Sequence, residues 1–87
     1  MKVASARIHR GDGFEVELIK MNLYTVKITA RFGSERFELI KKELKAIGAV
    51  YNPNFLRNGN KVWMLQGEDT IKAFKPVLKK LGGAKPV

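Results

Sequence analysis

The sequence of 87 residues contains no cysteine. Disulfide bonds, thiolate metal sites and thiol nucleophiles are therefore excluded from its chemistry. No apolar run approaches the roughly 20 residues that a helix needs to cross a bilayer. Residues 1–5 also lack the long apolar core of a signal peptide. These absences favour an intracellular, cytoplasmic protein without a membrane-spanning segment.

Side chains that could carry catalysis are also scarce. The single histidine, His9, stands beside Arg10 at the end of a predicted strand, where a surface residue is more common than a general base. Glu15 and Glu17 share one strand face, but a metal-dependent nuclease needs several oxygen ligands that converge. We expect no catalytic residue, metal site or cofactor, and therefore no enzyme. A small metal-dependent nuclease is kept as an alternative hypothesis.

Positive charge is what the sequence has in excess. It contains 17 lysine and arginine residues against 8 aspartate and glutamate residues, a formal net charge of +9 at pH 7. Such a field attracts polyanions, and binding to nucleic acid converts the charge into affinity by releasing counterions. Composition alone also allows an acidic protein or an anionic membrane surface; we expect nucleic acid as the partner, and no membrane.

The first third of the chain has the pattern of three antiparallel strands. Residues 3–9 and 14–20 are β-rich runs joined by Gly11-Asp12-Gly13, which is a good hairpin turn. A third strand is predicted over residues 24–32, where apolar and polar residues alternate. Its apolar face comprises Tyr24, Val26, Ile28, Ala30 and Phe32, and its polar face Thr25, Lys27, Thr29 and Arg31.

Two helices are predicted further along the chain. The first begins after Ser34, a suitable N-cap, and ends at Gly48. The second begins near Glu68 or Asp69 and is ended by Gly82-Gly83, and Pro76 is expected to kink or divide it. Each has one apolar stripe with spacings of three, four and three residues. The stripes are Phe37, Ile40, Leu44 and Ile47 in the first helix, and Ile71, Phe74, Leu78 and Leu81 in the second.

Two short strands are predicted between the helices. They cover residues 49–51 and 61–66, with a break at Asn52-Pro53 and a loop over residues 54–60. The predicted order is three strands, a helix, two strands and a helix.

The predicted fold class is α+β, with an antiparallel sheet. Both helices have one apolar stripe, so both can pack on the same sheet face and leave the other face open to solvent. We expect one small domain over residues 1–83 and a loose C-terminal tail over residues 84–87.

Two places in the sequence suit contacts to nucleic acid. Lys27 and Arg31 share the polar face of the third strand, and Arg7 extends this face along the first. Such groups contact phosphate, although a solvated strand face has the same pattern. In the loop, an exposed Phe55 would stack on an unpaired base while Arg57 and Lys61 hold phosphates; the alternative is that Phe55 folds back onto the core.

Two further aromatic residues are ambiguous. Trp63 and Tyr51 could each be a stacking platform, but a tryptophan in so small a domain is often the core anchor, and for Trp63 we favour the core. The predicted binding residues are Arg7, Lys27, Arg31, Tyr51, Phe55, Arg57, Lys61 and Trp63.

Residues 24–81 resemble the HARP domain, the small module beside the motor of annealing helicases. The resemblance rests on the basic strand Val26-Lys27-Ile28, the helix over residues 37–45, the pairing of Tyr51-Asn52-Pro53 with Lys61-Val62-Trp63, and the closing helix. It implies binding to DNA, particularly where single and double strands meet. The family has a shorter connection than the nine residues between Pro53 and Trp63, and no helicase motor is present here, so ATP-driven annealing is not implied.

The sequence thus predicts a non-enzymatic nucleic-acid-binding module, with DNA ahead of RNA and with single-stranded or junction character. The alternative is a protein-interaction module that docks on an acidic partner in a replication, repair or translation complex. Zero cysteine, one glutamine and abundant lysine favour a thermophilic source, whereas five asparagines speak against it.

Overall fold

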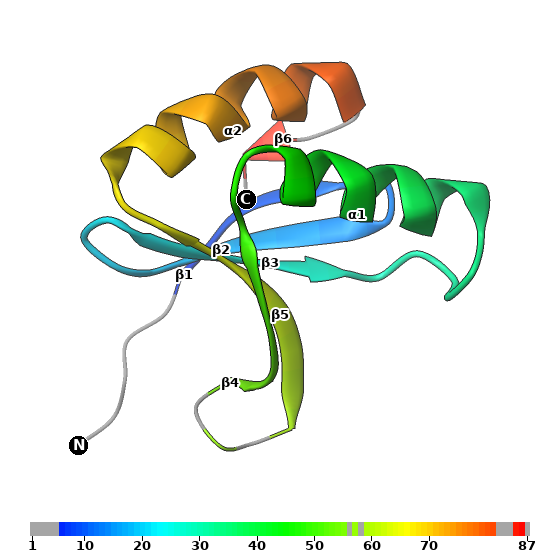
Figure 1. The fold of residues 1–87 in the computed structure, drawn as a ribbon, viewed down its shortest axis with the longest axis horizontal. Helices are drawn as coiled ribbons and strands as arrows, with labels where there is room; N and C mark the ends of the chain where they lie inside the picture. The colour runs from blue at the N-terminus through cyan, green and yellow to red at the C-terminus, as the bar shows by residue number, and fades with distance from the viewer. Residues whose placement is uncertain (1–5, 56, 58, 82–84, 87) are drawn as a thin grey trace.

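One antiparallel sheet and two helices make up the fold (Figure 1). We describe a computed structural model, which places residues 6–55, 57, 59–81 and 85–86, with side chains described for all of these except 6–8, 60 and 85–86. The elements are β1 (Ala6–Gly11), β2 (Phe14–Lys20), β3 (Leu23–Ile28), α1 (Glu35–Ala46), β4 (Val50–Phe55), β5 (Asn60–Gln66), α2 (Glu68–Leu81) and β6 (Lys85–Pro86). The sheet order is β4-β5-β3-β2-β1-β6. The α+β class and the order of the first seven elements are as predicted.

The C-terminal segment differs from its prediction as a loose tail. Lys85 and Pro86 form β6, which pairs with Arg10 and His9 of β1. The other residues of the predicted tail, 84 and 87, lie outside the described residues.

Both helices cover the same face of the sheet, as predicted (Figure 1). Val26 of β3 pairs with Val16 of β2 on one side and with Trp63 of β5 on the other, so these side chains form a row across three strands. One buried cluster joins this row to both helices. It comprises Phe14, Val16, Val26, Trp63 and Leu65 from the sheet, Ile40 and Leu44 from α1, and Phe74, Val77 and Leu81 from α2.

The β4–β5 hairpin projects away from the two helices (Figure 1). The predicted break at Asn52-Pro53 is wrong, because β4 continues through both residues to Phe55, which pairs with Asn60. A bulge between Asn52 and Phe55 accommodates the proline, and β4 is an edge strand, where a missing N–H donor is tolerated. Of the predicted loop over residues 54–60, Asn54, Phe55 and Asn60 therefore belong to the strands.

Of the two expected effects of Pro76, a kink or a division of α2, the division is wrong, because the helix is continuous through Pro76. Pro76 lies on the exposed side of α2, where water can bond the carbonyl group that loses its N–H partner. Within the described part of the chain, neither helix is long and apolar enough to span a membrane.

Strand β3 ends at Ile28, four residues earlier than predicted. Ile28 pairs with Phe14, the first residue of β2, so the neighbouring strand provides no partner beyond it. The N–H groups of Thr29 and Ala30 instead donate to the carbonyl oxygen of Gly13, at 2.7 and 3.0 Å. The chain then turns away from the sheet and enters α1 at the predicted cap, where the N–H of Phe37 donates to Ser34 Oγ at 3.1 Å.

The turn between β1 and β2 holds α1 as well. Arg36 Nε donates to the carbonyl oxygen of Asp12 at 2.7 Å, and Arg36 Nη2 donates to that of Leu81, also at 2.7 Å. Leu81 ends α2 and its carbonyl has no partner within that helix. A single guanidinium group therefore joins the Asp12-Gly13 turn, the start of α1 and the end of α2.

We predict that Gly13→Ala destabilises the fold by about 2 kcal/mol more than Gly48→Ala, because it adds overpacking to the same backbone strain. The two glycines have nearly equal φ angles of +87° and +88°. A Cβ atom on Gly13 would lie 2.8 Å from Ala30 Cβ, whereas one on Gly48 meets nothing within 4 Å. Urea unfolding of both variants measures the difference, and equal losses would contradict this role of Gly13.

Candidate nucleic-acid interface

Two pairs of aromatic side chains line one groove. The ring centroids of Phe32 and Phe37 are 5.1 Å apart at an interplanar angle of 59°, and those of Tyr51 and Trp63 are 5.2 Å apart at 46°. The larger part of the groove has a volume of about 440 Å³. A smaller part of about 160 Å³ shares all four aromatic residues and reaches Ile28 at the end of β3. We call this surface the aromatic groove.

The groove lies on the helix side of the sheet, where the helices stop covering it. Tyr51 and Trp63 pair across β4 and β5 and therefore lie on one face, in the same row as Val26 of the core. Phe32 comes from the connection after β3, and Phe37 from the first turn of α1. The projecting hairpin thus forms one wall, and Phe32 together with α1 from Phe37 to Lys45 forms the other.

The four rings differ in exposure. In each pair, one ring is packed against the protein and supports the other, which is exposed to solvent. Trp63 is buried as part of the core, and Phe37 is half-buried. Phe32 is 85% exposed and Tyr51 is 45% exposed. Leaving a phenylalanine in water forgoes about 2 kcal/mol of burial energy, and apolar groups gathered at a surface mark an interaction site. Each pair therefore consists of one anchored ring and one ring available to a ligand.

Positive charge surrounds the rings. Lys41, Lys45 and Lys61 line the groove, and no carboxylate is among its described lining residues. Lys41 Nζ lies 5.8 Å from the centroid of Phe37 and 3.1 Å from Glu38 Oε1, so that part of its charge is compensated. Lys45 and Lys61 are exposed. The groove is therefore suited to a ligand with flat rings and negative charge.

The structure brings together three of the residues predicted from the sequence. Tyr51, Lys61 and Trp63 all line the aromatic groove. Trp63 is a core residue, as we favoured, and at the same time forms part of the groove wall. Lys27, Arg31 and Arg57 are exposed but are not among the lining residues.

The predicted basic face of β3 is not continuous. Arg31 has left the strand, because β3 ends at Ile28, and Thr25 is buried. Lys27 remains exposed on the face away from the helices, but its partner in register is Glu15. For Arg7 only the backbone is described, and it pairs with Glu17 in β2.

Glu15 and Glu17, the two carboxylates of the nuclease hypothesis, lie on the same sheet face as Lys27. Glu15 Oε1 is 3.9 Å from Arg10 Nη2, and Glu15 also pairs with Arg10 in the sheet register. Glu17 pairs with Thr25 in β3. Among the residues that the structure describes, no three histidine, aspartate or glutamate side chains are grouped so as to hold a metal ion.

Phe55 does not have the exposure that its predicted stacking role requires. Its side chain is only 8% exposed, at the point where β4 pairs with β5. The alternative, that this residue folds back against the protein, is what the structure shows. We therefore correct the prediction for Phe55 from a binding residue to a structural one.

Sequence reasoning missed Ile28 and the four aromatic and basic groove residues Phe32, Phe37, Lys41 and Lys45. Two signals could have found the latter four. Ser34 caps α1, so the chain must turn before it, and Phe32 cannot continue a strand. Phe37, Lys41 and Lys45 are spaced by four residues, which places them along one ridge of the helix.

Comparisons with known proteins add no relatives: no protein-family model, no curated protein and no solved structure matches the chain. The resemblance to the HARP domain therefore stays an expectation from the sequence.

We predict that Phe55→Ala lowers the free energy of unfolding by about 3 kcal/mol, since it removes a buried aromatic ring. Tyr51→Ala should cost only about 1 kcal/mol, because that ring is half exposed and packs against a single other ring. Thermal or urea unfolding of the two variants distinguishes these roles. A Phe55→Ala variant as stable as Tyr51→Ala would overturn the correction.

Proposed function

We propose that this chain is a non-enzymatic module that binds single-stranded nucleic acid in the aromatic groove. One observation carries the proposal. Two available aromatic rings, Phe32 and Tyr51, share a groove with three lysines, and no described lining residue is acidic.

Stacking is the first part of the proposed mechanism. A base stacks on Tyr51, which is supported by Trp63, and a neighbouring base stacks on Phe32, which is supported by Phe37. Stacking of one base on an aromatic side chain contributes about 1–3 kcal/mol. Bases inside a duplex are already stacked on each other, so this arrangement favours a single strand, a loop or the single-stranded side of a junction.

Charge is the second part. Lys45 and Lys61 flank the rings and neutralise phosphates on either side of the stacked bases, with Lys41 as a weaker contributor because of its pairing with Glu38. Among the lining residues that the structure describes, none is an asparagine, glutamine, aspartate or glutamate that could read base edges. Stacking and phosphate contacts alone tolerate any sequence. We therefore propose binding with little sequence preference.

We also propose which nucleic acid the aromatic groove binds and in which cellular setting. The resemblance to a DNA-binding module supports DNA ahead of RNA, and sites where single and double strands meet. The lack of cysteine is in keeping with an intracellular setting.

Binding of a fluorescein-labelled oligothymidine to the full chain, followed by anisotropy at low salt, tests the proposal. We expect Tyr51→Ala and Phe32→Ala each to weaken binding about ten-fold, because each removes a stacking surface. Val50→Ala is the matched control: Val50 is 64% exposed, adjacent to Tyr51 and on the opposite face of β4. Absence of binding by the unaltered chain would refute the proposal, and equal losses in all three variants would exclude the groove as the site.

The single tryptophan provides a second measurement. Trp63 lies in the groove wall, so stacking of a base at Tyr51 should quench its fluorescence. The dependence of log K on log salt should flatten by about 0.7 for each phosphate that is no longer neutralised. We expect such a change for Lys45→Gln and Lys61→Gln, and none for Lys42→Gln, an exposed lysine of α1 outside the lining. Unchanged slopes in the two groove variants would remove the phosphate-binding part of the mechanism.

A further inference from the structure

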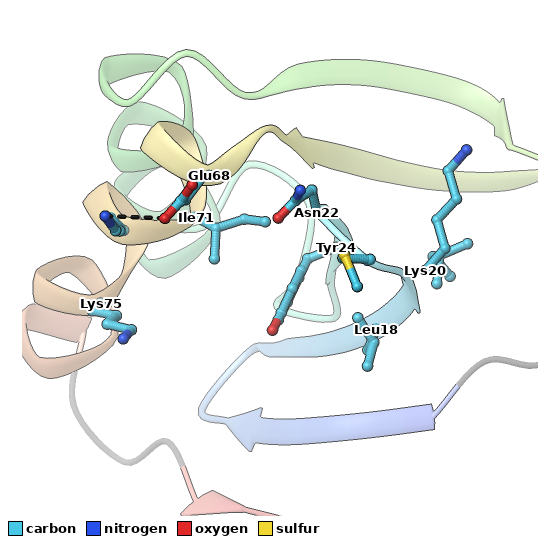
Figure 2. Close-up of a pocket in the computed structure, with 10 residues that line it drawn as sticks. Leu18, Lys20, Asn22, Tyr24, Glu68, Ile71 and Lys75 are labelled. Atoms are coloured by element: carbon cyan, nitrogen blue, oxygen red, sulfur yellow. Dashed lines mark ion pairs between the residues drawn. The ribbon is translucent and has the colours of Figure 1, made fainter.

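A second hollow lies at the opposite end of β3 from the aromatic groove. Tyr24, near the start of β3, lines this hollow, whereas Ile28, at the end of the strand, lines the groove. The hollow has a volume of about 690 Å³ and shares no described lining residue with the groove. Figure 2 shows side chains of the sheet, among them Leu18 and Tyr24, and side chains of α2, among them Ile71, around it. We call it the α2 hollow.

Backbone hydrogen bonds tie together the elements that line the α2 hollow. The turn between β2 and β3 has Asn22 at its tip, with a φ of 62°. The N–H of Gly67 donates to the carbonyl oxygen of Asn22 at 2.9 Å, and the N–H of Ile71 donates to that of Gly67 at 3.1 Å. The turn is thereby tied to the start of α2, so a ligand would meet a preformed backbone framework and would have to order only exposed side chains at its edge.

Its apolar surface is mainly aliphatic and reaches into solvent. Leu18, Ile19, Met21 and Ile71 contribute aliphatic or thioether side chains, and Tyr24 contributes the one aromatic ring among the described lining residues. Met21 is 86% exposed. A flexible methionine at the edge of a hollow can adapt to an apolar side chain placed there. The surface is therefore suited to aliphatic groups and offers few faces on which bases could stack.

The rim of the hollow is positive. Its described lining residues include three lysines, Lys20, Lys72 and Lys75, and one carboxylate, that of Glu68. Glu68 Oε1 is 3.1 Å from Lys72 Nζ, the ion pair that is dashed in Figure 2. Lys20 and Lys75 are exposed and leave an excess of positive charge beside the aliphatic surface.

We propose that the α2 hollow docks an acidic, amphipathic segment of a partner protein. Apolar side chains of that segment fill the hollow between Met21 and Ile71, and its carboxylates lie against Lys20 and Lys75. The charge complementarity selects an acidic partner, and the aliphatic lining selects a peptide over a nucleic acid. A helix laid in a groove provides both features, with apolar residues on one face and acidic residues beside them.

This interaction goes beyond the proposed function and does not depend on it. The two surfaces lie at opposite ends of one strand, so both can be occupied together. The module would then hold an acidic partner protein beside a single-stranded nucleic acid.

The test uses the full chain and a fluorescein-labelled model peptide with leucine at positions i, i+3, i+4 and i+7 and glutamate elsewhere. Two control peptides replace the leucines by serine or the glutamates by lysine. We expect the first peptide to bind and both controls to bind at least about ten-fold more weakly, the loss expected for removal of one good anchor. No binding of the first peptide at millimolar concentration, or equal binding of a control peptide, would overturn the proposal.

Variants of the chain locate the site. Met21→Ser and Lys75→Glu change exposed side chains and should each weaken peptide binding about ten-fold, with circular dichroism to verify the fold. Val50→Ser, an exposed apolar residue outside the hollow, should bind the peptide normally. Unchanged binding by Met21→Ser and Lys75→Glu would overturn the assignment.

Two further measurements separate this site from other occupants. Tyr51→Ala should weaken oligothymidine binding about ten-fold and leave peptide binding unchanged, while Met21→Ser should weaken peptide binding about ten-fold and leave oligothymidine binding unchanged. If only the oligothymidine result fails, the aromatic groove is refuted as a site and the peptide site is not. If Met21→Ser instead lowers affinity for oligothymidine, the hollow binds nucleic acid and the proposal is wrong. The peptide-docking proposal is equally wrong if the chain binds phosphatidylserine vesicles and Met21→Ser abolishes vesicle binding but leaves peptide binding unchanged.

Discussion

The Asp12-Gly13 turn is the constraint on which the rest of the structure depends. Its two carbonyl groups accept hydrogen bonds from parts of the chain far away in sequence: Gly13 from Thr29 and Ala30, and Asp12 from Arg36. These bonds place the segment after β3 and the start of α1 relative to the first hairpin. The turn can be so closely surrounded only because Gly13 has no side chain, since a Cβ atom there would lie 2.8 Å from Ala30 Cβ.

The exposure of Phe32 follows from this arrangement. Once Thr29 and Ala30 are bonded to Gly13, the chain has left the line of β3, and the Ser34 cap directs it into α1. Phe32 lies on the outside of this bend and contacts Phe37 instead of the core. The β4–β5 hairpin, which projects beyond the helices, supplies Tyr51 and Trp63 on the other side. The aromatic groove thus lies where the cover provided by the helices ends.

Local patterns in the sequence predict most of the fold because the features that they describe are local. Alternation and turn residues identified the strands, and the Ser34 cap with the apolar stripe identified α1. The errors concern residues whose state depends on distant partners. The alternation of β3 runs on to Phe32 in the sequence, but the strand stops at Ile28 because β2 begins at Phe14. No pattern within residues 24–32 contains that information.

The candidate site was predictable to a smaller extent for the same reason. Tyr51 and Trp63 are cross-strand partners, and Lys61 is two residues from Trp63, so a motif on one hairpin was enough to suggest all three. Phe32, Phe37, Lys41 and Lys45 belong to the other wall, and only the tertiary fold brings the two walls together. Phe55 was misjudged because the sequence places it in a loop, whereas the bulged β4 extends to include it and buries its ring.

Net charge and surface chemistry have separate roles in what the protein is proposed to bind. The charge of +9 attracts any polyanion and raises the rate of encounter over the whole surface, so it cannot distinguish nucleic acid from an acidic protein. The aromatic groove and the α2 hollow both have lysines at their rims, yet one is lined by four rings and the other mainly by aliphatic side chains. Because stacking requires ring faces and an apolar peptide side chain requires only a shaped apolar surface, the two linings support a different proposed ligand for each site. Composition left nucleic acid and an acidic protein as alternative partners. With one proposed site at each end of β3, one small domain is compatible with both.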